Sequence, residues 1–279
     1  MPKARNGAVE IEYETFGDSQ PETLLLVNGL GSQMTRWPEA FCVRLVARGY
    51  RVIRFDNRDT GLSTWLEGQS YVLADMARDG IAVLDACGVD RAHIAGVSMG
   101  GMIVQRMAID HPGRIVSMTS IMSAPGMATL KSTPEAAAVL NVAPPDPKAD
   151  FEAFIAHGMA NARTIGSPAY PWTDAELRAR AEGEYRRAFN PAGPARQRAA
   201  IGADGDRVAA LKGLKIPTVV LHGEADPLVQ PIGGQTTAAA ISGADLRMIP
   251  GMGHDMPPGL YDIFIDAICA AATRAKTNA

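Results

Sequence analysis

Ser98 lies in a short glycine-rich segment, Gly96-Val-Ser-Met-Gly100, at a point where a strand pattern changes to a helix pattern. The apolar run His93-Ile-Ala95 precedes it, and a helical pattern begins at Met102. A serine on such a sharp turn presents its hydroxyl at the strand end, and its crowded backbone needs glycine neighbours. The following helix would also place a partial positive charge beside it. The pattern therefore predicts a nucleophilic serine, with an ordinary glycine-rich helix start as the alternative.

A serine nucleophile needs a general base, and the chain offers five histidines. His254 lies in Pro250-Gly-Met-Gly-His-Asp-Met-Pro257, a glycine-flanked loop that directly follows the last predicted strand. This loop falls at the carboxyl edge of the predicted sheet, from which a base can reach Ser98. We therefore expect His254 to be the base. The other histidines fit structural, turn or cap positions: His93, His111, His157 and His222.

Asp226 follows the preceding strand, in His222-Gly-Glu-Ala-Asp-Pro227. A buried carboxylate there can hold the tautomer of His254 and stabilise its charged form. Glu224 is a rival that spacing alone does not exclude, and Asp255 and Asp56 are further candidates. The order serine, aspartate, histidine along the chain is the one expected with this kind of nucleophile turn.

The negative charge that develops during acyl transfer needs backbone N–H donors. One donor is expected from Met99, directly after the nucleophile. The other is expected from Leu30, in Asn28-Gly-Leu-Gly31, because this loop follows the buried strand pattern at residues 24–27. Gly29 and Gly31 would let that backbone approach a substrate closely.

The elements that must position these residues alternate between strand and helix. Apolar runs that end at turn residues predict strands buried on both faces, and residues 9–15 alternate with period two, as in a half-exposed edge strand. This alternation indicates an α/β fold with a mostly parallel, doubly wound sheet. The expected strands are 9–15, 23–27, 51–55, 91–95, 115–122, 218–221 and 246–249, and the expected helices are 37–48, 73–87, 99–111, 234–241 and 260–274.

The alternation is interrupted between residues 125 and 213, where no buried strand pattern occurs. Helical patterns at 151–163, 174–189 and 193–201 are separated there by proline- and glycine-rich stretches. We expect residues 1–124 and 214–279 to form the core domain and residues 125–213 to form a helical cap, or lid. Ligands of such sheets bind at the carboxyl ends of the strands, which the cap would cover.

Composition narrows the classes of partner. The chain has 279 residues, a formal net charge of −3 and 20% charged residues, so it lacks the basic surface of a nucleic-acid-binding protein. Three cysteines, Cys42, Cys87 and Cys269, show no metal or disulfide spacing, which suits a reducing compartment. Residues 1–14 lack the apolar region of a signal peptide, and no run is long enough to span a membrane. We expect a soluble, cytoplasmic protein with no cofactor and no metal, whose partner is a small-molecule ester.

These residues together resemble the α/β-hydrolase superfamily across nearly the whole chain. The resemblance rests on Asn28-Gly-Leu-Gly31, Asp56-Asn-Arg-Asp-Thr-Gly-Leu-Ser63, the segment around Ser98, Asp226 and His254. Within the superfamily, Asp56–Ser63, Val97-Ser-Met-Gly100 and Pro250-Gly-Met-Gly-His254 are similar to the aclacinomycin methylesterases and their relatives. The resemblance implies an α/β-hydrolase fold and a serine esterase. Many members have His-Gly where this chain has Asn28-Gly29, which leaves the shape of that loop open.

Some features of the chain resemble those of proteins with functions other than ester hydrolysis. Gly29 and Gly31 after a strand, with Asp56 ending the next one, resemble part of a dinucleotide-binding fingerprint, but Met34 occupies the third glycine position. A serine nucleophile also argues against dehalogenases and epoxide hydrolases of similar fold, which attack with aspartate. C–C bond hydrolysis, cofactor-free peracid formation and a non-catalytic ligand receptor stay open.

Methionines and cap aromatics predict the character of the substrate. Both groups fall where the pocket is expected, and methionine adapts to irregular apolar shapes. We therefore expect hydrophobic, uncharged esters of short to medium size to be preferred. The residues are Met34, Met99, Met122, Met127, Met252 and Met256, with Phe151, Phe154, Tyr170 and Trp172 in the cap.

Overall fold

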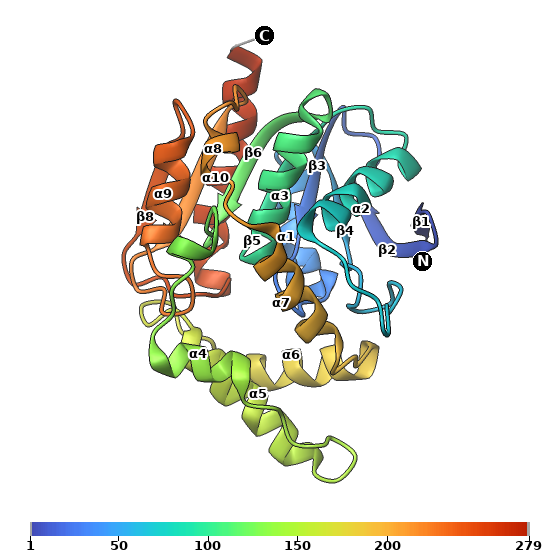
Figure 1. Cartoon of the computed structure of the whole chain (residues 1–279), viewed down its shortest axis with the longest axis vertical. Helices are drawn as coiled ribbons and strands as arrows, with labels where there is room; N and C mark the ends of the chain where they lie inside the picture. Colours follow the sequence, from blue (N-terminus) through green and yellow to red (C-terminus); the bar gives the residue numbers. More distant parts are fainter. Residues whose placement is uncertain (1, 278–279) are drawn as a thin grey trace.

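A computed structural model describes residues 2–277 of the chain. Residues 1, 278 and 279, at the two ends of the expected core domain, lie outside this part. Within it, one sheet of eight strands is covered by helices on both faces, and a further group of helices lies at one end of the sheet (Figure 1). No helix in the described residues is long and apolar enough to cross a membrane.

The sheet runs in the order β1-β2-β4-β3-β5-β6-β7-β8. β2 pairs antiparallel with both β1 and β4, and every other neighbouring pair is parallel. The expectation that residues 9–15 form an edge strand is wrong, because β1 pairs outside β2 and forms the edge itself. The strands are β1 (Lys3–Asn6), β2 (Val9–Phe16), β3 (Glu22–Val27), β4 (Tyr50–Phe55), β5 (Ala92–Val97), β6 (Ile115–Ile121), β7 (Thr218–Gly223) and β8 (Asp245–Ile249).

Two apolar cores lie on opposite faces of the sheet. α1 (Glu39–Val46) and α10 (Tyr261–Thr277) cover one face. Phe41 of α1 belongs there to the same apolar cluster as Phe264 and Ile268, which lie on one side of α10. Residues at this spacing share one side of a helix, so their burial fixes α10 against the sheet. α2 (Leu73–Ala86), α3 (Met99–Asp110) and α9 (Ile232–Ala240) cover the other face. Single 3₁₀ turns are Met34–Arg36, Pro112–Arg114, Met127–Thr129 and Pro258–Leu260.

Five helices are inserted between β6 and β7. They are α4 (Pro134–Asn141), α5 (Phe151–Ile165), α6 (Asp174–Arg187), α7 (Gly193–Asp204) and α8 (Val208–Leu211). At the starts of α4, α5 and α6, otherwise free backbone N–H groups donate hydrogen bonds to the side chains of Thr133, Asp150 and Thr173, respectively. Figure 1 shows α4, α5 and α6 together at one end of the sheet.

α7 and α8 return the chain to the core. α7 contacts α2, and α8 packs against α3 and α9. Both short helices fall inside the range 125–213 that the sequence assigns to the cap, whereas α4, α5 and α6 make up the part that lies away from the core helices. The division of the chain into core and cap at residues 125 and 213 stays a prediction.

Candidate active site

Ser98 occupies a tight turn between β5 and α3. Its φ of 57° and ψ of −122° lie in a region that residues other than glycine rarely adopt. A Cβ atom on Gly96 would come within 2.1 Å of the Gly100 carbonyl oxygen, and one on Gly100 within 2.2 Å of the Val27 carbonyl oxygen. The glycines around Ser98 are therefore required by the close packing of this turn against β3, as the sequence pattern predicts.

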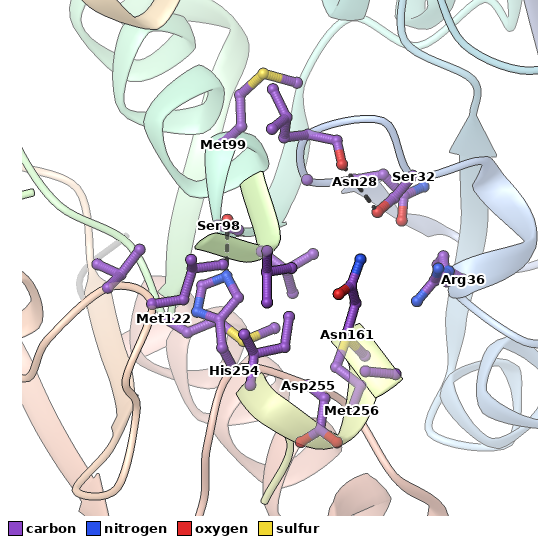
Figure 2. A pocket seen from close by; sticks show the side chains of 18 of the residues that line it. Asn28, Ser32, Arg36, Ser98, Met99, Met122, Asn161, His254, Asp255 and Met256 are labelled. Atoms are coloured by element: carbon purple, nitrogen blue, oxygen red, sulfur yellow. Dashed lines mark hydrogen bonds between the residues drawn. The ribbon is translucent and has the colours of Figure 1, made fainter. Parts of the chain in front are cut away.

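His254 points at Ser98 from the loop that follows β8 (Figure 2). Its Nε2 atom lies 2.9 Å from Ser98 Oγ, and its Nδ1 atom lies 2.8 Å from Asp226 Oδ2. The loop is held by the inserted helices, because the His254 N–H donates to the Ile165 carbonyl at 2.7 Å and the Gly253 N–H donates to Ser167 Oγ at 2.8 Å. The end of α5 thus sets the position of the imidazole.

Asp226 is buried after β7 and is well supplied with donors. Its Oδ1 atom accepts the backbone N–H groups of Leu228 and Val229, each at 2.9 Å. Burial works to raise the pKa of this carboxyl, but the adjacent His254 and His222 rings outweigh it and hold the pKa at about 2. An ionised carboxylate can only accept hydrogen bonds, so His254 Nδ1 carries the proton. His254 Nε2 is then the acceptor that faces the Ser98 hydroxyl.

The other acids considered from the sequence lie elsewhere. Glu224 is exposed, although only two positions separate it from Asp226. Asp56 is buried and pairs with Arg187 at 2.7 Å, and its other oxygen accepts the Met34 N–H at 2.7 Å. Burial raises the pKa of Asp56. Its contacts hold the turn after β4 against α6, away from His254.

Asp255 links the His254 loop to the inserted helices. Its carboxylate accepts hydrogen bonds from Ser167 Oγ and, at 3.0 Å, from Trp172 Nε1. Burial raises the pKa of Asp255, although the hydrogen bond from Ser167 and the charge of Arg180 oppose the shift. In Figure 2 the Asp255 carboxylate points away from Ser98 while the neighbouring His254 ring points toward it. Asp255 therefore does not contact His254 Nδ1.

The remaining histidines have other partners. His93 Nδ1 lies 2.8 Å from Ser117 Oγ, and His222 Nε2 donates to the Val229 carbonyl at 2.7 Å. His157, on α5, lies 2.9 Å from Asn161. His111 is half-buried and directly follows the last residue of α3.

Two backbone N–H groups beside Ser98 are free to donate. Leu30 and Met99 both line the cavity above Ser98, and neither N–H has an acceptor among residues 2–277. The loop that carries Leu30 lies against the serine, because a Cβ atom on Gly29 would come within 3.1 Å of Ser98 Cβ. Leu30 and Met99 therefore both lie at the cavity next to Ser98, and the role of their N–H groups as oxyanion donors stays a prediction.

Gln197 and Asn57 hold that loop in place, and sequence reasoning missed both. The Gly31 N–H donates to Gln197 Oε1 at 2.7 Å, while Gln197 Nε2 donates to the Arg58 carbonyl at 2.8 Å. Asn57 Nδ2 donates to the Asn28 carbonyl at 3.0 Å. Gln197 is fully buried on α7 and lies more than 160 positions after Gly31 in the sequence, so only the fold reveals this contact.

A cavity of about 850 Å³ opens above Ser98 and His254. Five methionines line it: Met99, Met102, Met122, Met127 and Met256. The expectation that Met34 and Met252 would do so is wrong, because Met34 is fully buried below the loop and Met252 packs in the core under α10. Met102 was not expected, since its place on α3 resembles an ordinary core position.

Of the four cap aromatics expected at the pocket, Trp172 lines this cavity and Phe154 lines a neighbouring one. Phe151 and Phe154 pack with Tyr185, at centroid distances of 5.3 and 5.4 Å, in an aromatic cluster between α5 and α6. Tyr170 packs against the core beneath α10. Sequence alone could not separate these roles, because aromatic residues on a cap helix serve helix packing as well as a pocket.

The sheet order, the serine turn and the helices inserted after β6 define a class of protein. Residues 22–257 match the family described as the alpha/beta hydrolase fold, and the chain belongs to this family. It is 29% identical to rhodomycin D methylesterase DauP from a Streptomyces species, over 96% of each chain. It is also 30% identical to a putative carbamate hydrolase, RutD from Variovorax paradoxus, over 88% of this chain and 89% of the relative.

Solved structures show the same fold. A meta-cleavage product hydrolase from Pseudomonas fluorescens superposes with a TM-score of 0.82 at 20% identity, over 99% of this chain and 98% of that one. A hydrolase from Pseudomonas aeruginosa superposes with a TM-score of 0.76 at 27% identity, over 95% and 94%. The family and these relatives identify the chain as a hydrolase, of the kind that includes the methylesterases it resembles.

Proposed function

We propose that this protein hydrolyses carboxylic esters, with Ser98 as nucleophile, His254 as general base and Asp226 as the acid that orients the base. The carrying observation is the continuous chain of hydrogen bonds from Ser98 Oγ through the His254 ring to Asp226, at 2.9 and 2.8 Å. The similarity of this chain to methylesterases supports ester hydrolysis, and its similarity to putative carbamate hydrolases supports attack on a related carbonyl group.

The geometry accounts for each step of such a reaction. Ser98 Oγ attacks the ester carbonyl carbon while His254 Nε2 takes the hydroxyl proton, and ionised Asp226 stabilises the imidazolium that forms. The carbonyl oxygen becomes an oxyanion, to which the Leu30 and Met99 N–H groups are expected to donate hydrogen bonds. Collapse of this intermediate expels the alcohol, protonated by His254, and leaves an acyl-enzyme. Water, deprotonated by His254, attacks the acyl-enzyme, releases the acid and restores Ser98.

The cavity wall beside Ser98 favours apolar groups. Methionines on α3, after β6 and after His254 surround the hydroxyl, so an acyl or alkoxy chain of short to medium length can be buried there. Because each buried CH₂ contributes about 0.8 kcal/mol, and flexible side chains accommodate several shapes, discrimination between neighbouring lengths is expected to be shallow.

The test is a panel of methyl esters from acetate to octanoate, with acid release followed by pH-stat, using the native protein and Ser98→Ala. We expect the native protein to cleave these esters and Ser98→Ala to lose at least about 10³-fold in kcat with an unchanged melting temperature. Absence of ester cleavage by the native protein, combined with tight binding of the esters, would favour a receptor instead. Cleavage of β-diketones at rates above those of the esters would favour C–C hydrolysis.

A further inference from the structure

The cavity above Ser98 continues into a second compartment beneath the inserted helices. This compartment has a volume of about 550 Å³ and shares part of its wall with the first. Figure 2 shows Arg36 and Asn161 on the side of the pocket away from Met122 and His254. Four polar side chains lie on this shared wall, in contrast to the methionine-lined wall at Ser98. Shared residues include Leu30, Arg36, Leu140, Asn161, Arg180 and Arg198.

Arg180, on α6, differs from the other arginines of this boundary. Arg36 pairs with Glu184, with 2.9 Å between Nη2 and Oε2, and Arg198 donates to the Leu140 carbonyl. Arg180 donates no hydrogen bond and forms no ion pair within residues 2–277, and its guanidinium carbon lies 4.8 Å from the centroid of the Trp172 ring. A cation on an aromatic face keeps its in-plane N–H groups available for another partner.

The carboxylates nearest to Arg180 are already engaged. Both oxygens of Glu184 accept from Arg36, and those of Asp255 accept from Ser167 and Trp172. Burial, together with the nearby charge of Arg36, lowers the pKa of Arg180 to about 10, although the charges of Glu184 and Asp255 oppose this shift. Neither carboxylate forms a hydrogen bond or ion pair with Arg180, so the N–H groups of this half-buried cation can bind an anionic ligand.

Arg180 is also tied to the reactive centre through rigid contacts. Its stacking partner Trp172 donates a hydrogen bond to Asp255 at 3.0 Å, and Asp255 directly follows His254 in the sequence. An anion bound at Arg180 would therefore lie close to a side chain that contacts the loop of His254.

We propose that Arg180 binds a carboxylate group of the ester substrate, which holds the charged end of that substrate at the boundary of the two compartments while its ester lies at Ser98. A planar guanidinium can bind a carboxylate through two parallel hydrogen bonds. This assignment rests on the proposed ester hydrolysis. It replaces the expectation of an uncharged substrate, while the apolar part of the substrate stays against the methionines.

The test compares esters that differ by one carboxylate. Monomethyl succinate, glutarate, adipate and suberate are paired with the methyl esters of the matching monoacids, and 4-(acetoxymethyl)benzoate is paired with benzyl acetate to place the charge on the alcohol side. Each pair is assayed with the native protein, Arg180→Gln and Arg180→Lys. Arg178→Gln is the matched control, because Arg178 is exposed on the same helix and pairs with Glu152 and Glu182 instead of lining either compartment.

We expect at least one charged ester to exceed its neutral partner in kcat/KM by about tenfold or more. Arg180→Gln should abolish that preference, by about ten- to hundredfold and mainly through KM, while kcat/KM for the neutral ester changes much less. Arg180→Lys should keep part of the preference, and Arg178→Gln all of it. Equal losses for both members of a pair would show that Arg180 merely supports the cap, and neutral esters preferred in every pair would also overturn the inference, with ester hydrolysis intact. Failure to cleave any ester would instead overturn the proposed function itself.

Discussion

Asp226→Asn changes one oxygen of the proposed catalytic centre to an amide nitrogen. In the native structure one carboxylate oxygen accepts from His254 Nδ1 at 2.8 Å, and the other accepts two backbone N–H groups at 2.9 Å. An asparagine that keeps its oxygen toward the backbone must present its NH₂ group to His254 Nδ1. That arrangement favours the tautomer with the proton on Nε2, which faces Ser98 and cannot accept the hydroxyl proton.

The opposite amide orientation is also costly. It would place the NH₂ group against the N–H groups of Leu228 and Val229, and each buried donor left without an acceptor costs about 1–3 kcal/mol. We therefore expect the first orientation, and a fall in kcat of about 10³–10⁴-fold with little change in KM, which corresponds to about 4–5.5 kcal/mol of transition-state stabilisation.

The assay is steady-state hydrolysis of methyl hexanoate, with Glu224→Gln as the matched control. Glu224 is exposed and lies two positions from Asp226, so its amide should stay within about twofold of the native rate. A variant within tenfold of the native kcat, or an equal loss in Glu224→Gln, would refute the role given to Asp226.

Three further outcomes are expected. Across methyl acetate, butanoate, hexanoate and octanoate, kcat/KM should change by no more than about fourfold per CH₂, and a sharp cut-off at one methylene would contradict a methionine-lined pocket. Asp226, with its pKa lowered from 3.8 to about 2, should contribute about 2 kcal/mol to the free energy of unfolding above pH 4, a contribution lost as the pH falls from 4 to 2. Urea unfolding at several pH values should therefore show the native protein and Asp226→Asn converging in acid, and a constant difference would argue against this. Gly96→Ala should unfold or inactivate the protein, because its Cβ would meet the Gly100 carbonyl, whereas Gly183→Ala, at an open position on α6, should raise the melting temperature slightly.

Local patterns were sufficient to predict most of the sheet and the sites of the reactive residues. The glycines around Ser98, and the loops after β7 and β8, mark strand ends, and parallel strands bring their carboxyl ends to one edge. Hence Ser98, Asp226 and His254 could be expected to meet, and their catalytic roles stay predictions. β1 was missed because Lys3–Asn6 is short and polar and buries only Ala4 against the sheet.

Contacts between distant segments could not be predicted in this way. Whether a methionine lines a cavity or fills a core depends on which neighbour covers it, as Met102 and Met252 show. The same holds for Trp172, which connects α6 to the loop of His254 across more than 80 positions. Periodicity reports which face of a helix is apolar, but it does not report which helix that face meets.

The most direct test of the central claim is covalent labelling of the nucleophile. A fluorophosphonate reacts with a serine that is activated by a base, and peptide mass mapping locates the adduct. We expect one adduct, on the peptide that contains Ser98, with labelling abolished in Ser98→Ala and strongly slowed in Asp226→Asn. An adduct on any other serine, or labelling that persists in Ser98→Ala, would contradict this claim.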